Sequence, residues 1–194
     1  MHRLFSVLLI TLLVGCLGNK TQPSLAIYDF GLAVAPVNEP LPEIPFLIED
    51  VSAPESLNNN RIRYRLNYEN ATRVYSYTES RWLASPAELL THRLRVLTRT
   101  TPTFQSCTLK MQLATFDHVF DSPNVSKGVV ILLAELVDTK TRKLVLSQRI
   151  EESVAAPSQD AKGGVAALKI AGDNALINVL AWGKSAVETT AVCR

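Results

Sequence analysis

Apolar and polar residues alternate along most of this chain, and the alternation predicts β-strands. In segment 61–66 every second residue is apolar and the residues between are arginines, which is typical of a strand buried on one face. Segment 129–137 is apolar on both faces except at Glu135, which predicts a central strand. Strands are predicted at residues 25–30, 46–51, 61–66, 74–78, 107–117, 129–137 and 143–151, with turns or connections at 67–72, 118–127 and 138–142.

A first helix is predicted between the fourth and fifth strands. Ser85 suits an N-cap, Pro86 suits the first helical position, and Glu88 completes a capping box with the serine. Leucines follow at helical spacing, so the helix is expected to run to about Arg99.

A second and longer helix is predicted from Asp160 to about Val187. Its alanine-rich face suits close packing on a sheet, while the adjacent Gly163 and Gly164 weaken its first turn. The element order is therefore β-β-β-β-α-β-β-β-α. It predicts an α+β fold, a two-layer sandwich in which a mostly antiparallel sheet is covered by two helices. We expect one domain over residues 25–194.

The composition is that of a globular chain, and the charge argues against a nucleic-acid partner. Of 194 residues, 47% are hydrophobic and 20% are charged, which excludes wholesale disorder. The formal net charge is +2, without the concentrated basic face that nucleic acid usually needs, so no nucleic-acid partner is expected.

The first sixteen residues have the pattern of a secretion signal. Arg3 precedes an apolar run that is shorter than the about 20 residues needed to span a bilayer. The run ends in Leu13-Val14-Gly15-Cys16, which resembles a bacterial lipobox. The resemblance implies a removable signal peptide at 1–15, acylation of Cys16, and a lipidated tether at 16–24. The alternative is a soluble secreted protein with a chance cysteine near the cleavage site.

The expected lipid anchor also suggests a cellular location. Two or more acyl chains, such as palmitate, hold a protein stably on a membrane, whereas one chain binds marginally. The residue after Cys16 is Leu17, not the aspartate that favours inner-membrane retention in enterobacterial-type sorting. By that resemblance we expect the outer membrane, with the domain on its periplasmic face. Three Asn-x-Ser/Thr triplets, at residues 19, 70 and 124, would carry glycans in a eukaryotic secreted protein and argue against this compartment.

Two cysteines remain if Cys16 is acylated. Cys107 opens a predicted strand and Cys193 is the penultimate residue. Thiols in an oxidising periplasm often pair, so we expect a disulfide between these two cysteines. The alternative is two unpaired thiols.

Several short motifs together resemble one known family. They are Tyr28-Asp29-Phe30-Gly31, Arg61-Ile62-Arg63-Tyr64-Arg65, Tyr75-Ser76-Tyr77, Arg81-Trp82-Leu83-Ala84-Ser85-Pro86 and Phe116-Asp117-His118-Val119-Phe120. In their order and spacing these motifs resemble the ABC-type transport auxiliary lipoprotein (PqiC-like) family, and the resemblance extends from Ser24 to Trp182.

The resemblance implies an accessory role and not catalysis. It implies a fold of the TolB amino-terminal type and an MCE-domain protein of an ABC lipid transporter as the partner, with a homo-oligomeric ring as a candidate assembly. The family usually has two prolines after the tryptophan motif, whereas this chain has only Pro86.

No catalytic, cofactor or metal motif is recognised. His92 is predicted on a helix surface, and Asp117, His118 and Asp121 are predicted in a solvated loop that forms at most a weak cation site. We therefore expect no enzyme activity, no cofactor and no metal.

Seven residues are candidates for partner binding, each with a structural alternative. Trp82 either contacts a partner or fills the junction between sheet and helix. The arginines either meet an acidic partner or lipid headgroups, or form a solvated strand face. The candidates are Tyr28, Arg61, Arg63, Arg65, Tyr75, Tyr77 and Trp82.

Two other functions compete with transporter docking. One is a free-standing periplasmic lipid-binding module, which needs an enclosed apolar cavity and for which strand 129–136 is a candidate lining. The other is an envelope-assembly lipoprotein.

Overall fold

The computed structural model describes residues 24–32, 43–98 and 106–193. The predicted signal peptide at 1–15, the acylation site Cys16 and nearly all of the tether lie outside the described residues. The expected end of the first helix at Arg99 also lies outside them.

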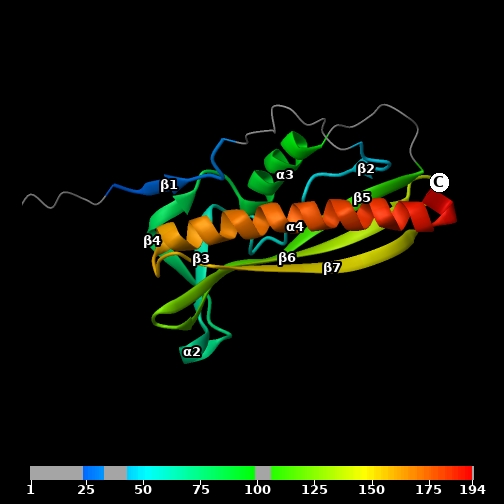
Figure 1. The fold of residues 1–194 in the computed structure, drawn as a ribbon. Helices are drawn as coiled ribbons and strands as arrows, with labels where there is room; N and C mark the ends of the chain where they lie inside the picture. Colours follow the sequence, from blue (N-terminus) through cyan, green and yellow to red (C-terminus); the bar gives the residue numbers. More distant parts are fainter. Residues whose placement is uncertain (1–23, 33–42, 99–105, 194) are drawn as a thin grey trace, which may run out of the picture.

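Seven strands form one sheet (Figure 1). Along the sheet the order is β1-β4-β3-β5-β6-β7, and β2 pairs with β5 beside this path. The long β5 therefore lies at the centre: β6 covers one of its edges, while β2 and β3 share the other. The strands are β1 (Ala26–Tyr28), β2 (Leu47–Ile48), β3 (Arg61–Leu66), β4 (Tyr75–Trp82), β5 (Cys107–Ser122), β6 (Val125–Asp138) and β7 (Leu144–Ala155).

The long pairings in the sheet are antiparallel, as predicted. They join β5 to β6 and β6 to β7, and the shorter β3–β4 pair is antiparallel as well. Three short parallel pairings were not predicted, namely β1 with β4, β2 with β5 and β3 with β5. The sheet is therefore mixed.

The strand boundaries differ most from the prediction around residues 118–127. This segment was predicted as a connection, but β5 continues to Ser122 and β6 begins at Val125, so the hairpin turn is reduced to two residues. Strands β1 and β2 are shorter than predicted: β1 pairs only with Ser80–Trp82 of β4, and β2 only with Thr108–Leu109 of β5.

Both predicted helices are present; the longer one packs along the sheet, and the shorter one packs against the longer one. They are α3 (Pro86–Leu97), which begins with the expected Ser85 cap, and α4 (Ala161–Thr189), which is capped by Asp160, the residue predicted as the start of that helix. The Ser85 hydroxyl accepts a hydrogen bond from the Glu88 amide at 3.4 Å, and the Asp160 carboxylate accepts one from the Gly163 amide at 2.8 Å. The short α2 (Asn67–Asn70) lies where a turn was predicted, and a 3-10 turn, η2 (Ala191–Cys193), follows α4.

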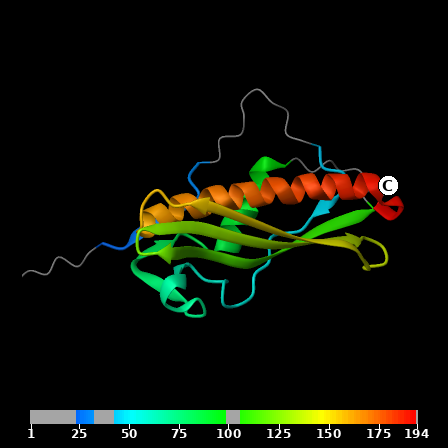
Figure 2. The same ribbon diagram turned by 60° about the horizontal axis from the view of Figure 1, so that its bottom comes forward.

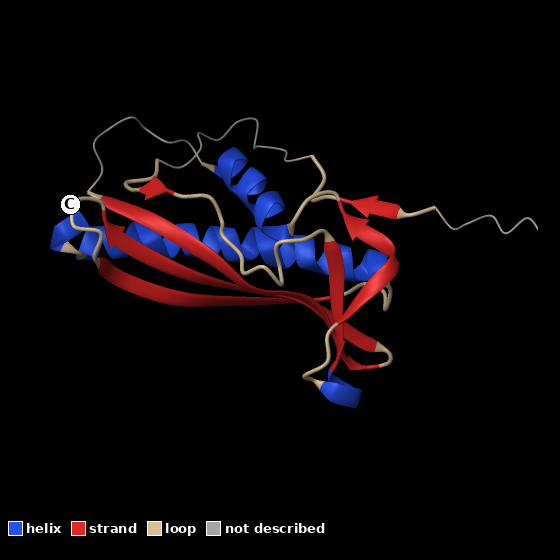
Figure 3. Ribbon diagram, turned by 180° about the vertical axis from the view of Figure 1, so that it is seen from behind, coloured by secondary structure: helices blue, strands red, loops and turns tan. Residues whose placement is uncertain are grey.

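Helix α4 lies along one face of the β5–β6–β7 sheet (Figures 1 and 2). Seen from behind, the strands lie in front of this helix (Figure 3). By length and apolarity α4 is able to cross a membrane, but 56% of its most apolar stretch is buried, which is typical of a core helix. A buried ion pair joins it to α3: Arg93 Nε lies 2.7 Å from an Asp173 carboxylate oxygen.

Close packing of α4 depends on residues without a Cβ. A Cβ on Gly164 would lie 2.4 Å from the His118 ring, and one on Gly128 of β6 would lie 2.6 Å from the α4 backbone at Leu168. Gly164 therefore does more than weaken the helix start, because it lets the first turn of α4 rest on a buried side chain of β5.

A disulfide joins the start of β5 to the end of the chain. Cys107 and Cys193 are bonded, with their Cα atoms 5.2 Å apart, which is the pairing expected from the cysteine count. The bond fixes η2 and the last turn of α4 against the sheet.

Candidate functional site

The tryptophan of the motif at 81–86 belongs to the core. Trp82 is 1% exposed, and its ring packs edge-on against Phe30 and Phe116 at centroid distances of 5.8 and 5.6 Å. Trp82 is therefore not a partner-binding residue, and its structural alternative is correct.

The basic stripe predicted on β3 is also mostly internal. Arg63 Nε lies 2.9 Å from Asp117 Oδ1, and Arg65 Nε donates to Asp117 Oδ2 at 2.6 Å. The Asp117 side chain is completely buried, and the Arg63 and Arg65 side chains are only 15% and 26% exposed. We call these three residues the charge clamp. For Arg63 and Arg65 both predicted alternatives, a surface for an acidic partner or lipid headgroups and a solvated strand face, are wrong. The prediction that Asp117 lies in a solvated loop is also wrong.

The reason is a parallel contact that the sequence did not suggest. Strand β3 lies directly beside the second half of β5, with Tyr64 opposite His118 and Arg65 opposite Val119. The arginine side chains therefore reach the buried carboxylate of Asp117 on that part of β5. Of the predicted stripe only Arg61 is exposed, and it lies opposite Arg81 of β4.

The two candidate tyrosines of β4 belong to a second cluster beside the charge clamp. Tyr64 stacks on Tyr75 and Tyr77 at centroid distances of 5.0 and 4.7 Å, and Phe120 and His118 complete the group. We call these five residues the aromatic cluster. Tyr75 lies at its edge, where the Arg73 guanidinium covers the ring at 4.6 Å.

His118 is the most constrained member of the aromatic cluster. It is fully buried, its Nδ1 lies 2.9 Å from the Tyr77 hydroxyl, and its Nε2 has no hydrogen-bond partner. Burial lowers the pKa of His118 to about 4, although the charge of Asp160 acts in the opposite direction. Burial also raises the pKa of Tyr77. Both side chains are therefore neutral at pH 7.

Exposed apolar side chains gather near β1, and the sequence analysis did not predict them. Leu25, Ile27 and Leu83 are 51%, 59% and 63% exposed, while Tyr28 is half-buried against the core. The Leu83 amide donates to the Tyr28 carbonyl at 2.7 Å, so this residue lies directly beside β1. We call Leu25, Ile27 and Leu83 the β1 patch. The run at 25–30 is apolar except at Asp29, so its pattern did not show which apolar side chains remain in solvent.

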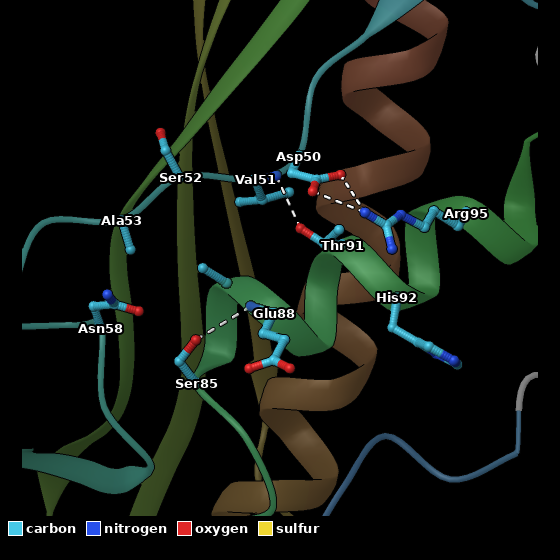
Figure 4. Close-up of a pocket in the computed structure, with 11 residues that line it drawn as sticks. Asp50, Val51, Ser52, Ala53, Asn58, Ser85, Glu88, Thr91, His92 and Arg95 are labelled. Carbon is cyan, nitrogen blue, oxygen red and sulfur yellow. Dashed lines mark hydrogen bonds and ion pairs between the residues drawn. The ribbon is translucent and has the colours of Figure 1, made fainter.

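A groove lies between α3 and the segment that follows β2 (Figure 4). Its volume is about 630 Å³. Arg95 binds Asp50 at 2.8 Å across it, and Thr91 accepts a hydrogen bond from the Val51 amide at 2.9 Å. We call this cavity the α3 groove. Its remaining lining residues are Ser52, Ala53, Asn58, Ser85, Ala87, Glu88 and His92.

A second hollow of about 360 Å³ lies on the other side of α3. Phe30, Leu83 and Leu89 line it, and it shares Glu88 and His92 with the α3 groove. His92 is exposed, as predicted for a helix surface, and it borders both hollows. The outward part of α3 is therefore accessible from both sides and adjoins the β1 patch through Leu83.

The described residues contain no group of three or more His, Cys, Asp or Glu side chains arranged to hold a metal. Val130, Leu132 and Leu136 of β6 are completely buried within the main core cluster together with residues of α4. The face of β6 considered as a cavity lining is thus packed core.

Comparisons with known proteins identify relatives by structure alone. No family model and no curated protein matches the chain. The crystal structure of protein XCC0632 from Xanthomonas campestris, assigned to family DUF330, has a TM-score of 0.68 at 16% identity, covering 84% of this chain and 97% of that one. An uncharacterised protein structure has a TM-score of 0.59 at 13% identity, covering 82% of this chain and 98% of that one.

These two matches show that the chain shares its fold with XCC0632 and the second protein. A candidate lipoprotein from Caulobacter crescentus also matches, over 51% of this chain, with a TM-score of 0.36, which is too low to support an argument. The shared fold alone does not define an activity.

Proposed function

We propose that this chain is a lipid-anchored envelope protein that docks the periplasmic MCE-domain component of an ABC lipid transporter at the outer membrane. The observation that carries the proposal is Leu13-Val14-Gly15-Cys16, placed at the end of a short apolar run and separated by eight residues from Leu25, where the domain begins. The order of the motifs resembles that of the transport auxiliary lipoproteins, and this resemblance is the reason for proposing an MCE-domain protein as the partner.

The disulfide supports an extracytoplasmic location for the domain. Cys107 is fully buried and Cys193 is 4% exposed, and they are bonded to each other. Structural disulfides persist in oxidising compartments such as the periplasm and are rare in the cytosol.

The short tether supports docking near the membrane. Eight residues separate Cys16 from Leu25, and an extended chain covers at most about 3.6 Å per residue, so the β1 patch stays within about 30 Å of the acyl chains. We propose that the β1 patch and the adjoining α3 groove form the docking surface, because apolar side chains at the centre and charged groups at the rim are typical of protein interfaces.

The anchor is tested by replacing Cys16. Cys16→Ala removes the acceptor thiol, so we expect the protein to leave the outer-membrane fraction and to appear soluble or unprocessed. Cleaved Cys16→Ala protein that stays in the outer-membrane fraction would contradict the anchor.

The docking surface is tested by a photo-crosslinking residue at position 83 in the full-length acylated protein. Position 144 is a matched control, because Leu83 and Leu144 are 63% and 58% exposed and Leu144 lies on β7, the opposite edge of the sheet. We expect position 83, and not position 144, to crosslink to an MCE-domain protein. Crosslinking only to lipid would favour the lipid-binding alternative and contradict docking.

A further inference from the structure

Strand β7 forms the outer edge of the sheet and is long and exposed. It spans Leu144–Ala155, and among the described residues no strand pairs with its outer side. Most of its side chains are exposed, including Leu144 at 58% and Leu146 at 40%. A long edge strand presents a row of unpaired backbone groups, which natural proteins usually shorten, cover or pair.

We propose that β7 pairs antiparallel with the β7 of a second copy of this chain, and that the two-fold axis passes through Ile150. The pairing would join the two sheets into one continuous sheet with both α4 helices on the same face. This inference concerns a surface on the edge opposite to the β1 patch and does not depend on the acylation of Cys16 or on the docking partner.

Backbone geometry limits the registers that such a pair is able to adopt. In an antiparallel ladder both backbone groups of a residue point to the same neighbour, so alternate residues of β7 face β6 and the free edge. In a pair of identical strands, a residue whose backbone groups face the free edge must therefore lie opposite another such residue, and a residue whose backbone groups face β6 opposite another of that type. The two-fold axis must then lie on a residue and not between two residues.

Charge selects one of these registers. An axis at Arg149 places arginine opposite arginine, and an axis at Glu151 or Glu152 places glutamate opposite glutamate, which is unfavourable for directly opposed residues. An axis at Gln148 creates no opposite-charge pair between the central residues. An axis at Ile150 places Arg149 opposite Glu151 of the second copy, and this contact occurs twice.

The other residues fit the same register. Ser147 lies opposite Ser153, and Leu146 opposite Val154, while Ile150 meets its own copy. On the face that carries α4, Gln148 lies opposite Glu152, whose carboxylate already accepts a hydrogen bond from Asn178 at 2.6 Å. The ladder reaches from Val145 to Ala155, which is almost the whole strand.

The structure of the single chain already brings the two charges together. Arg149 Nη1 lies 2.5 Å from Glu151 Oε2 in the same strand, and the side chains are 55% and 48% exposed. Pairing two strands in this register would gather two arginines and two glutamates into one alternating group. A strand whose charges served only to prevent edge pairing would remain monomeric, and this is the alternative that the experiment tests.

The test is disulfide crosslinking with Ser147→Cys and Ser153→Cys combined in the full-length protein in its membrane. In the proposed register the two positions face each other across the interface, where opposed Cα atoms lie about 4.5–5.5 Å apart, within disulfide range. Within one chain they are six residues apart in a strand, about 20 Å, so they cannot bond to each other. Each single cysteine variant is the control, because neither position meets its own copy.

We expect covalent dimers from the double cysteine variant under mild oxidation and at least tenfold less from either single variant. Adding Glu151→Arg should lower the dimer yield at least fivefold, and adding Arg149→Glu to that variant should restore it. Circular dichroism checks that each variant is folded. The proposal is overturned by equal crosslinking of the single variants, by absence of dimers from the double variant, or by failure of the charge exchange to restore the yield.

Discussion

The two halves of β5 are equally buried but by different chemistry. In the first half, Leu109, Met111 and Leu113 are at most 2% exposed within an apolar core. In the second half, Asp117 and His118 are completely buried. A register shift between Leu113 and Thr115 separates the two halves.

The comparison shows that burial in the second half depends on particular partners. Apolar packing tolerates many side chains of similar volume, whereas a buried charge needs its counter-ion. Asp117 forms ion pairs with Arg63 and Arg65 of β3, whereas the hydrogen-bond partner of His118 is the Tyr77 hydroxyl of β4. The second half of β5 should therefore be the more sensitive to single substitutions.

The largest effect is expected from Asp117→Ala. It leaves two half-buried guanidinium groups without their counter-ion, which typically costs about 3–5 kcal/mol. Urea unfolding of the wild-type protein and the variant measures the difference. Asp50→Ala is the matched control, because its pair with Arg95 is 66–67% exposed and should contribute less than about 1 kcal/mol. Equal losses in the two variants would contradict the role of the charge clamp.

The second-largest loss of stability is expected from removal of the disulfide, which is attached to the first half of β5. Cys107→Ser combined with Cys193→Ser frees the end of the chain and should cost about 2–5 kcal/mol. The thermal midpoint of the double variant and that of the reduced wild-type protein should fall together. An unchanged midpoint would show that η2 is held by packing alone.

The stability should also depend on pH through His118. Its pKa in the folded protein is about 4, below the about 6.5 of an unfolded chain, so the unfolded state binds the proton first. The stabilising difference is fully present above pH 6.5 and is lost as the pH falls toward 4, by up to about 3 kcal/mol. Unfolding free energies measured between pH 4 and 7 test this. His118→Leu should flatten the profile, whereas Tyr77→Phe should keep most of the slope.

Glycine contacts on α4 should differ in sensitivity along the helix. Gly164→Ala places a Cβ 2.4 Å from the His118 ring, and overpacking of this kind costs about 1–3 kcal/mol. Gly172→Ala meets only the end of the Leu90 side chain, at 3.1 Å, and should be nearly neutral because alanine favours the helix. Thermal unfolding of both variants checks the order, and a larger loss at Gly172 would contradict the packing described here.

The smallest effect is expected from a conservative change in the first half of β5. Leu109→Met keeps the side-chain volume and should cost less than about 1.5 kcal/mol. A loss as large as that of Asp117→Ala would remove the distinction between the two halves.

The elements with strong local signals were predicted well. Strand 61–66 matches β3 at both ends, the predicted Ser85 cap begins α3, and α4 begins directly after its predicted start at Asp160. Alternation within a strand and capping within a helix are properties of neighbouring residues, so the sequence displays them directly.

The functional residues were predicted less well because they depend on distant contacts. Arg63, Arg65 and Asp117 look like solvated charges in the sequence, and only the parallel pairing of β3 with β5 makes them a buried clamp. The sequence left two alternatives for Trp82, contact with a partner or burial at the junction between sheet and helix. Only its ring contacts with Phe30 and Phe116 show that it belongs to the core. The β1 patch combines Leu25 and Ile27 with Leu83, which lies beside β1 through the pairing of β1 with β4, and no local pattern reveals that pairing.

The mass of the N-terminal peptide of the mature protein, purified from its native membrane, tests the central claim most directly. The account predicts that the peptide begins at Cys16 and carries a diacylglycerol group on its sulfur and an acyl chain on its amino group. A mature protein that begins elsewhere, or that begins at Cys16 with an unmodified sulfur, would contradict the proposed anchor and with it the docking role.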